Sequence, residues 1–278
     1  PQQPQHPQPQ FARESFTVLD GWWDYAVIPA GEAATSWSFA TQPHEWDGRI
    51  RVPFSPEAPL SGVGQQLQPG ELLWYRRMLT APALDDSHRC ILHFEALDYA
   101  CVCYCNGQLV GTHVGGYLPF SFDITDALLS TCGNELVLCV FDPSDAGVQP
   151  RGKQRLERGG IWYTAQSGIW QTVWLEVVPC AHIAALAIDA QPDAGKLVLT
   201  VTLDDAVVGN DADSEPAPNQ LSSPETPRLV AHLLDGVAAR AVDDAGELGT
   251  LAGKGHEGAV LLGAAARPLD GKVEVGAV

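Results

Sequence analysis

Apolar and polar residues alternate over short stretches through the first two thirds of the chain, and turn residues separate these stretches. Alternation with a period of two predicts β-strands that are buried on one face. Only residues 123–129 suit a helix, a short capped one. The pattern therefore predicts an all-β chain, with strands at residues 16–26, 89–95, 99–105, 108–114, 135–142 and 169–178.

The turns between these strands carry signals of their own. Asn106 and Gly107 separate two predicted strands, and this pair favours a type I′ hairpin because both central residues of that turn need positive φ. Asp20 and Gly21 predict a turn inside the first strand segment. Many short strands joined by such turns are typical of an antiparallel β-sandwich.

Several segments match one known pattern. They read LDGWWDYA at residues 19–26, VPFSPE at 52–57, LSGVG at 60–64, LWYRR at 73–77 and GGIWYTAQSGIWQTVWLEVVP at 159–179. Together they resemble the N-terminal sugar-binding domain of glycoside hydrolase family 2, the family of β-galactosidases, β-glucuronidases and β-mannosidases. The resemblance covers residues 11–179 and implies a jelly-roll, galactose-binding-like β-sandwich there.

The flanking segments differ in composition. Residues 1–10 predict a disordered Pro/Gln tail and no intact signal peptide, since no apolar region follows a charged one. For residues 180–278 the strand pattern and the resemblance imply a partial immunoglobulin-like β-sandwich. Within it, an acidic segment rich in Ser and Pro at residues 204–227 predicts a disordered insertion. We expect the chain to be a processed or excised piece of a longer protein.

The resemblance also implies a function. In family 2 both catalytic glutamates lie on a (β/α)₈ barrel that this chain lacks, so we expect no catalytic residue here. The chain would be the non-catalytic N-terminal portion of a retaining β-glycosidase, which hydrolyses O-glycosyl bonds through a covalent glycosyl-enzyme. It would supply scaffold and a substrate-lining loop. Two alternatives stay open: a stand-alone lectin-like module that binds carbohydrate without cleaving it, and a purely structural fragment.

The expected substrate-lining loop follows the strand at residues 135–142. The resemblance places a sugar-binding aspartate on this loop, with Asp145 as the first candidate and Asp142 as the second. A carboxylate suits the role because it accepts charge-assisted hydrogen bonds from hydroxyl groups. The alternative is that both aspartates cap turns, where Asp is common.

Cationic and aromatic residues follow in the same region. Four cations lie within residues 151–158, and Arg151 is the first of them. A guanidinium can bind a uronate carboxylate, or it can pair with acidic groups of the barrel. Trp162 and Tyr163 can stack on a sugar face or pack between domains. The predicted substrate-binding residues are therefore Asp145, Asp142, Arg151, Trp162 and Tyr163.

The net charge limits the classes of partner that this chain can bind. The net charge of −18 argues against nucleic acid and against an anionic membrane, because both bind basic surfaces. We expect a carbohydrate substrate and the catalytic barrel of the same protein as partners, and a homo-oligomer is compatible with both. We expect no cofactor.

The chain contains seven cysteines. Cys101, Cys103 and Cys105 alternate along one predicted strand, which places all three on one buried face. Their spacing does not match the usual zinc-ligand patterns, so we predict no metal site. Unpaired cysteines suit a reducing compartment, and we expect the protein in the cytoplasm.

Overall fold

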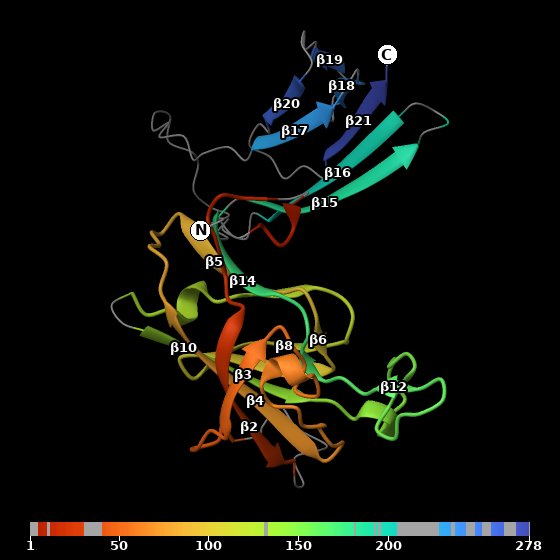
Figure 1. The fold of residues 1–278 in the computed structure, drawn as a ribbon. Coiled ribbons are helices and arrows are strands. Elements are labelled where there is room, and N and C mark those ends of the chain that lie inside the picture. Colours follow the sequence, from red (N-terminus) through yellow and green to blue (C-terminus); the bar gives the residue numbers. More distant parts are fainter. Residues whose placement is uncertain are drawn as a thin grey trace, which may run out of the picture. The chain divides into compact units, whose positions relative to one another are not determined.

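Strands dominate the chain because β-branched and aromatic residues alternate with polar ones along it. The structure, a computed structural model, describes residues 5–9, 12–30, 41–130, 133–180, 182–191, 193, 196–204, 228–234, 237–242, 248–251, 257–263 and 271–277. These residues contain no α-helix, so the all-β prediction is confirmed. The chain divides into two units, Pro1–Val178 and Pro179–Val278 (Figure 1).

Two sheets build the first unit, and this confirms the predicted β-sandwich. The larger sheet is antiparallel, in the order β3 (Gly48–Val52), β2 (Gly21–Pro29), β4 (Glu71–Thr80), β10 (Gly133–Phe141), β7 (Ala100–Cys105), β8 (Gln108–Val114). The smaller sheet has the order β1 (Phe16–Val18), β14 (Val173–Pro179), β5 (His88–Phe94), β9 (Phe120–Asp123). Two further strand pairs, β11 (Gln154–Arg155) with β12 (Tyr163–Thr164) and β6 (Leu97–Asp98) with β13 (Gly168–Ile169), belong to the loops.

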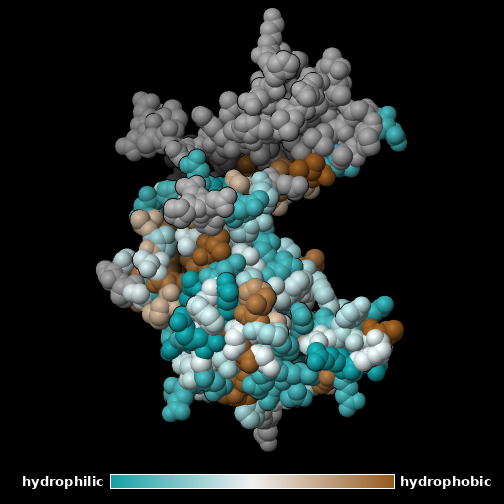
Figure 2. All heavy atoms as spheres, in the orientation of Figure 1, coloured by the Kyte–Doolittle hydropathy of each residue, from teal (hydrophilic) through white to brown (hydrophobic). Residues whose placement is uncertain are grey.

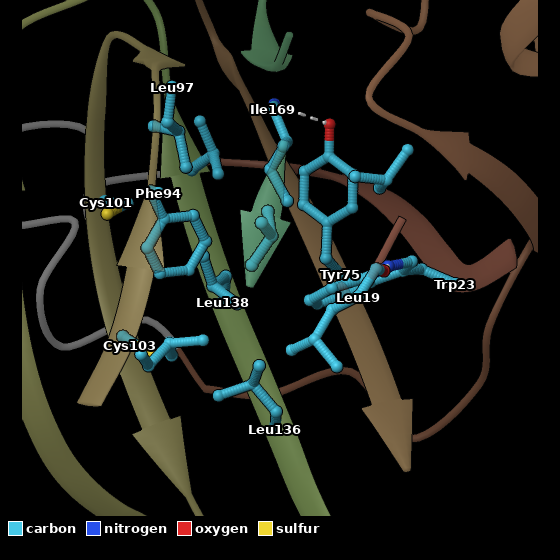
Figure 3. Close-up of a cluster of buried hydrophobic side chains, with 14 of the residues drawn as sticks. Leu19, Trp23, Tyr75, Phe94, Leu97, Cys101, Cys103, Leu136, Leu138 and Ile169 are labelled. Atoms are coloured by element: carbon cyan, nitrogen blue, oxygen red, sulfur yellow. Dashed lines mark hydrogen bonds between the residues drawn. The ribbon is translucent and has the colours of Figure 1, made fainter. Parts of the chain in front are cut away.

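The core fills the space between the two sheets (Figure 3). Trp23 is buried there, and its indole Nε1 donates to the Leu19 carbonyl at 2.9 Å. Tyr75 is also buried, and its hydroxyl accepts from the Ile169 backbone N–H at 3.2 Å. Each polar atom of these large rings therefore has a partner, as a dry core requires.

The predicted cysteine face and the predicted hairpin are confirmed. Cys101, Cys103 and Cys105 are all buried, and the six described cysteines are all free thiols. Burial raises the pKa of the Cys105 thiol to about 11, so it stays protonated at neutral pH. The turn between β7 and β8 has φ of 51° at Asn106 and 77° at Gly107, as a type I′ turn needs.

Two local predictions were wrong. The expected strand at residues 169–178 is two strands, because Ile169 pairs with β6 whereas β14 begins at Val173. Asp20 holds the break, since its carboxylate accepts from the Val173 backbone N–H and the Thr172 hydroxyl, each at 3.2 Å. The expected helix at 123–129 is a single 3-10 turn, η5 (Thr125–Ala127). The described residues also form the 3-10 turns η4 (Pro59–Ser61) and η6 (Ser144–Ala146).

The N-terminal residues 5–9 pack on the first unit rather than forming a disordered tail. The His6 ring meets the buried Trp174 ring edge-on, with 4.9 Å between centroids. Gln8 donates through Nε2 to Glu95 Oε1 at 3.2 Å, and Trp174 donates to the same oxygen at 2.8 Å. Composition missed these contacts because one aromatic partner and one carboxylate, both distant in sequence, provide them.

Strands also build the second unit. A five-stranded sheet has the order β15 (His182–Gln191), β16 (Lys196–Asp204), β21 (Gly271–Ala277), β18 (Val237–Val242), β19 (Leu248–Leu251). A separate pair joins β17 (Arg228–Leu234) and β20 (Glu257–Gly263). Apart from Asp204 at the end of β16, the insertion predicted at residues 204–227 lies outside the described residues.

Candidate functional site

The loop that follows β10 is tied down by a buried aspartate. Asp142 Oδ1 accepts from the Ser144 backbone N–H at 2.7 Å, and Oδ2 accepts from the Ser167 hydroxyl at 2.8 Å. The first of these bonds closes a turn of the kind that Asp side chains favour and holds Ser144 at φ 48°. Both carboxylate oxygens of Asp142, a predicted sugar-binding residue, thus accept hydrogen bonds from the protein itself.

Glu57 anchors the same region from the other side. Its Oε1 accepts from the Leu67 backbone N–H at 3.2 Å, and its Oε2 accepts from the Ser167 backbone N–H at 3.1 Å. Burial raises the pKa of Glu57, and it also raises the pKa of Asp142. Ser167 is therefore bound by two carboxylates at once, which fixes the chain just before β13.

A third carboxyl group lies beside these two. Asp98, at the end of β6, is only 6% exposed, and its carboxyl has no hydrogen-bond partner among the described residues. Burial raises the pKa of Asp98 to about 7, and the charges of Asp142 and Glu57 add to this effect. We call Glu57, Asp98 and Asp142 the carboxyl cluster. Its members share a region of low solvent access, where like charges oppose one another's ionisation.

The loop between β8 and β9 packs against the carboxyl cluster. A side chain at Gly116 would overlap the Asp98 carboxyl group unless that group moved. The Gly116 carbonyl accepts from Trp170 Nε1 at 2.9 Å, and Tyr117 meets the Trp170 ring edge-on. Burial raises the pKa of the Tyr117 hydroxyl, and the charges of Asp98 and Asp142 raise it further. The loop between β8 and β9 is therefore held beside the carboxyl cluster by its contacts with Trp170.

Asp145 and Arg151 extend from the part of the loop that the cluster anchors. Asp145 lies on η6, directly after Ser144, and its side chain is partly exposed. The Arg151 guanidinium donates to the Gly147 carbonyl at 3.1 Å, which folds the loop back on itself. Both predicted residues therefore lie on one short loop whose base is fixed by Asp142.

Trp162 and Tyr163 lie on the neighbouring arm around β11 and β12. The Arg155 guanidinium lies 4.0 Å from the centroid of the Trp162 ring, so one face of that indole is already occupied. Tyr163 is 69% exposed, and its backbone N–H donates to the Lys153 carbonyl at 2.8 Å. Figure 2 shows a hydrophobic tip where Figure 1 places the loops around β12. Of the two rings, Tyr163 is the more exposed.

A conservative change at Asp142 tests the anchoring. Asp142→Asn keeps an acceptor for the Ser144 N–H but replaces the oxygen that accepts from Ser167, so the first unit should lose about 1 kcal/mol of unfolding free energy. All eight tryptophans lie before residue 179, so urea unfolding followed by tryptophan fluorescence reports this unit. Asp126→Asn, on the exposed turn η5, is the control and should be neutral. Equal losses in both variants would refute an anchoring role.

Neither a metal site nor a membrane helix is found where the structure is described. Among the described residues no three His, Cys, Asp or Glu side chains form a group that could hold a metal ion. Glu57, Asp98 and Asp142 therefore do not form such a group. No described helix is long and apolar enough to cross a membrane.

Comparison with known proteins places the first unit. Residues 13–179 match the family model described as glycosyl hydrolases family 2, sugar binding domain. A putative beta-glucuronidase of Formosa agariphila is 29% identical over 153 residues, which cover 55% of this chain and 16% of the relative. A beta-galactosidase of Thermoanaerobacter pseudethanolicus is 30% identical over 111 residues, covering 40% of this chain and 14% of the relative. The chain thus spans only a small fraction of these relatives.

Solved structures share the fold. A b-glucuronidase from Ruminococcus gnavus in complex with uronic deoxynojirimycin gives a TM-score of 0.53 at 19% identity, covering 92% of this chain and 40% of that chain. A Bacteroides uniformis beta-glucuronidase also gives 0.53, at 22% identity, covering 95% and 28%. The family model covers more than half of the chain and includes the motifs quoted from the sequence. The chain therefore belongs to glycosyl hydrolases family 2, and residues 13–179 are its sugar-binding domain.

Proposed function

We propose that this chain is the N-terminal, non-catalytic portion of a family 2 β-glycosidase that hydrolyses a terminal β-linked sugar with retention of configuration. The loop of Asp145 and Arg151, fixed at its base by Asp142, is the observation that carries the proposal. A rigid base lets a short polar loop present a carboxylate and a guanidinium to a sugar at low entropic cost. The names of the matched relatives support a glycoside as the substrate.

Within the proposal, Asp145 contacts substrate and Asp142 positions the loop. Arg151 and Tyr163 face the same catalytic barrel, which belongs to the rest of the protein. The antiparallel sheets of the second unit support its assignment as part of an immunoglobulin-like sandwich. The isolated chain is expected to be inactive, because the acid and nucleophile of glycoside hydrolysis lie elsewhere. The cytoplasmic location and the homo-oligomer stay predictions.

The test uses the full-length protein. Asp145→Ala should lower kcat/KM for an aryl β-glycoside by roughly 10-fold to 100-fold, the usual worth of a hydrogen bond to a charged group. Asp126→Ala, an exposed aspartate on the other 3-10 turn, is the matched control and should leave kcat/KM unchanged. The proposal fails if both variants keep full activity.

A stand-alone lectin-like module is the second candidate, and the exposed Tyr163 ring favours it. The coding sequence beyond Val278 distinguishes the two candidates. A barrel-length extension with two suitably placed glutamates supports the glycosidase, whereas an immediate stop codon supports the lectin. Saturable binding of galactose, glucuronate or mannose oligosaccharides by the isolated chain, lost in Asp145→Ala, would also favour the lectin.

A further inference from the structure

A tryptophan and two arginines form an open group on the outer face of the six-stranded sheet. In the β2–β3 pair, Trp22 lies opposite Arg51 and Asp24 lies opposite Arg49. Residues directly opposite in an antiparallel pair share one face, and side chains two apart along a strand do too. Trp22, Arg49 and Arg51 therefore lie together on the face opposite to the buried Trp23. We call these three residues the Trp22 platform.

The indole of Trp22 has neighbours at the turn after η4 and at Arg49, and it stays half exposed. A Cβ added at Gly62 would lie 3.2 Å from two carbons of its six-membered ring, so the turn after η4 supports the ring. The Arg49 guanidinium carbon lies 5.6 Å from the centroid of the Trp22 ring. The side chain nevertheless stays 48% exposed. A supported indole with almost half of its surface exposed can still stack on a ligand.

The cations of the platform form no ion pair in the described part of the chain, although Asp24 lies opposite Arg49. Arg49 and Arg51 are exposed, and within the described part of the chain neither has a carboxylate partner. On the next strand Arg76 differs, because it pairs with Asp24 at 2.7 Å and approaches Glu135 at 3.8 Å. In a chain with a net charge of −18, two unpaired guanidinium groups beside an exposed indole point to an anionic ligand.

Protection of a sheet edge explains only part of this arrangement. β3 is an edge strand, and charged side chains there discourage pairing with another chain. Edge protection explains why the arginines are on β3. It does not explain the half-exposed indole beside them, because an apolar ring does not discourage strand pairing. A protein partner would need a larger contact area than one ring and two arginines offer. On the face drawn in Figure 2, the apolar areas of the first unit are small and separated by polar ones.

We propose that the Trp22 platform binds an acidic oligosaccharide. The indole stacks on the apolar C–H face of a pyranose ring, and the arginine forks bind the carboxylates of that sugar unit and its neighbour. Arg49 and Arg51 are two residues apart on one strand, so their Cα atoms are about 7 Å apart. That spacing lets them address successive units of an extended chain. The residues of the Trp22 platform differ from those of the Asp145 loop. The platform proposal and the proposed function can therefore fail independently.

The test is a calorimetric titration of the full 278-residue chain with hexagalacturonate, and with a neutral galactose hexamer as the comparison. We expect saturable binding of the acidic hexamer that weakens as salt increases, and at least tenfold weaker binding of the neutral one. Trp22→Ala should weaken hexagalacturonate binding at least tenfold, and Trp22→Phe should keep part of it. Arg49→Gln combined with Arg51→Gln should remove the preference for the acidic hexamer and the salt dependence.

Leu109→Ala is the matched control, because it removes another exposed apolar side chain, on the opposite edge strand of the same sheet, without touching the platform. It should leave the affinity unchanged, and unaltered melting of every variant shows that each one is folded. The proposal is overturned if no saturable binding occurs or if the neutral hexamer binds equally well. It is also overturned if Trp22→Ala binds normally, and loss of binding in Tyr163→Ala would then assign the ligand to the loop of the candidate site.

Discussion

Gly168→Ala should destabilise the first unit by about 3 kcal/mol, the largest effect we expect from a single methyl group. Two costs combine. Gly168 has φ of +75°, where a residue with a Cβ pays about 1–2 kcal/mol. The added carbon would also overlap the Tyr75 hydroxyl, and forcing extra volume into a packed core costs about 1–3 kcal/mol. Figure 3 shows that hydroxyl held by the Ile169 N–H.

Gly64→Ala separates the two costs. Gly64 has φ of +68° but nothing within 4 Å of an added Cβ, so this variant should lose only about 1 kcal/mol. Urea unfolding followed by tryptophan fluorescence measures both losses. Tyr75→Phe should cost less in the Gly168→Ala background than in the parent chain, because it also removes the overlapping oxygen. Similar losses for the two glycine variants would show that the overlap is relieved at no cost.

Asp98→Asn should stabilise the first unit at neutral pH, which is rare for a buried position. The folded state holds the pKa of this carboxyl near 7, mainly by burial, against an ordinary value of 3.8. Ionising it at neutral pH therefore opposes folding, and the full difference between the two values corresponds to at most about 4 kcal/mol. Asparagine never ionises, and we expect a gain of about 2 kcal/mol at pH 8 because local relaxation already relieves part of the cost.

The sign of the pH dependence follows from the raised pKa. Between pH 4 and 7 the folded state binds more protons at Asp98 than the unfolded state, so stability falls as pH rises through this window. The raised pKa values of Glu57 and Asp142 act in the same direction. Glu176 acts oppositely: burial raises its pKa, but hydrogen bonds from His93 and Arg13 lower it overall, so its contribution is lost in acid.

Urea midpoints of the first unit at pH 5, 6, 7 and 8 measure this slope. The parent chain should be more stable at pH 5 than at pH 8, and Asp98→Asn should flatten most of the difference. Glu95→Gln, at another carboxylate of the same unit, is the control and should keep the slope. If the pH dependence persists unchanged in Asp98→Asn, groups other than Asp98 cause it.

The sandwich could be predicted from sequence because its signals are local. The Asn106-Gly107 turn and the alternation of Cys101, Cys103 and Cys105 each specify a conformation within a few residues. The break before β14 could not be predicted in this way. It depends on Asp20, which lies far away in sequence and satisfies the backbone at Val173. Residues 169–178 form a nearly continuous apolar run with high β-propensity, so the sequence pattern does not show that the chain changes from one sheet to another there.

The candidate site was predicted only in part for a similar reason. The sequence left Asp142 open between a sugar-binding residue and a turn cap, and the structure shows that it closes the turn. The sugar-binding roles of Asp145 and Arg151 stay predictions. Glu57 and Asp98 were missed because their importance arises from burial and from one another's charge, which spacing does not reveal. The available signal was an acidic residue inside an otherwise apolar segment, as at Asp98 in EALDYA.

The position of β14 in its sheet determines when the first unit can fold in the cell. β14 lies between β1 and β5, so the earliest strand of the unit pairs with the last one, Phe16 opposite Glu176. A ribosome must therefore release almost the whole unit before that sheet can close. Until then β1 and β5 present unpaired edges, which are sites of aggregation. The nascent chain therefore exposes unpaired strand edges for longer than a chain of local hairpins would, and rapid completion of synthesis or a chaperone would shorten or cover this exposure.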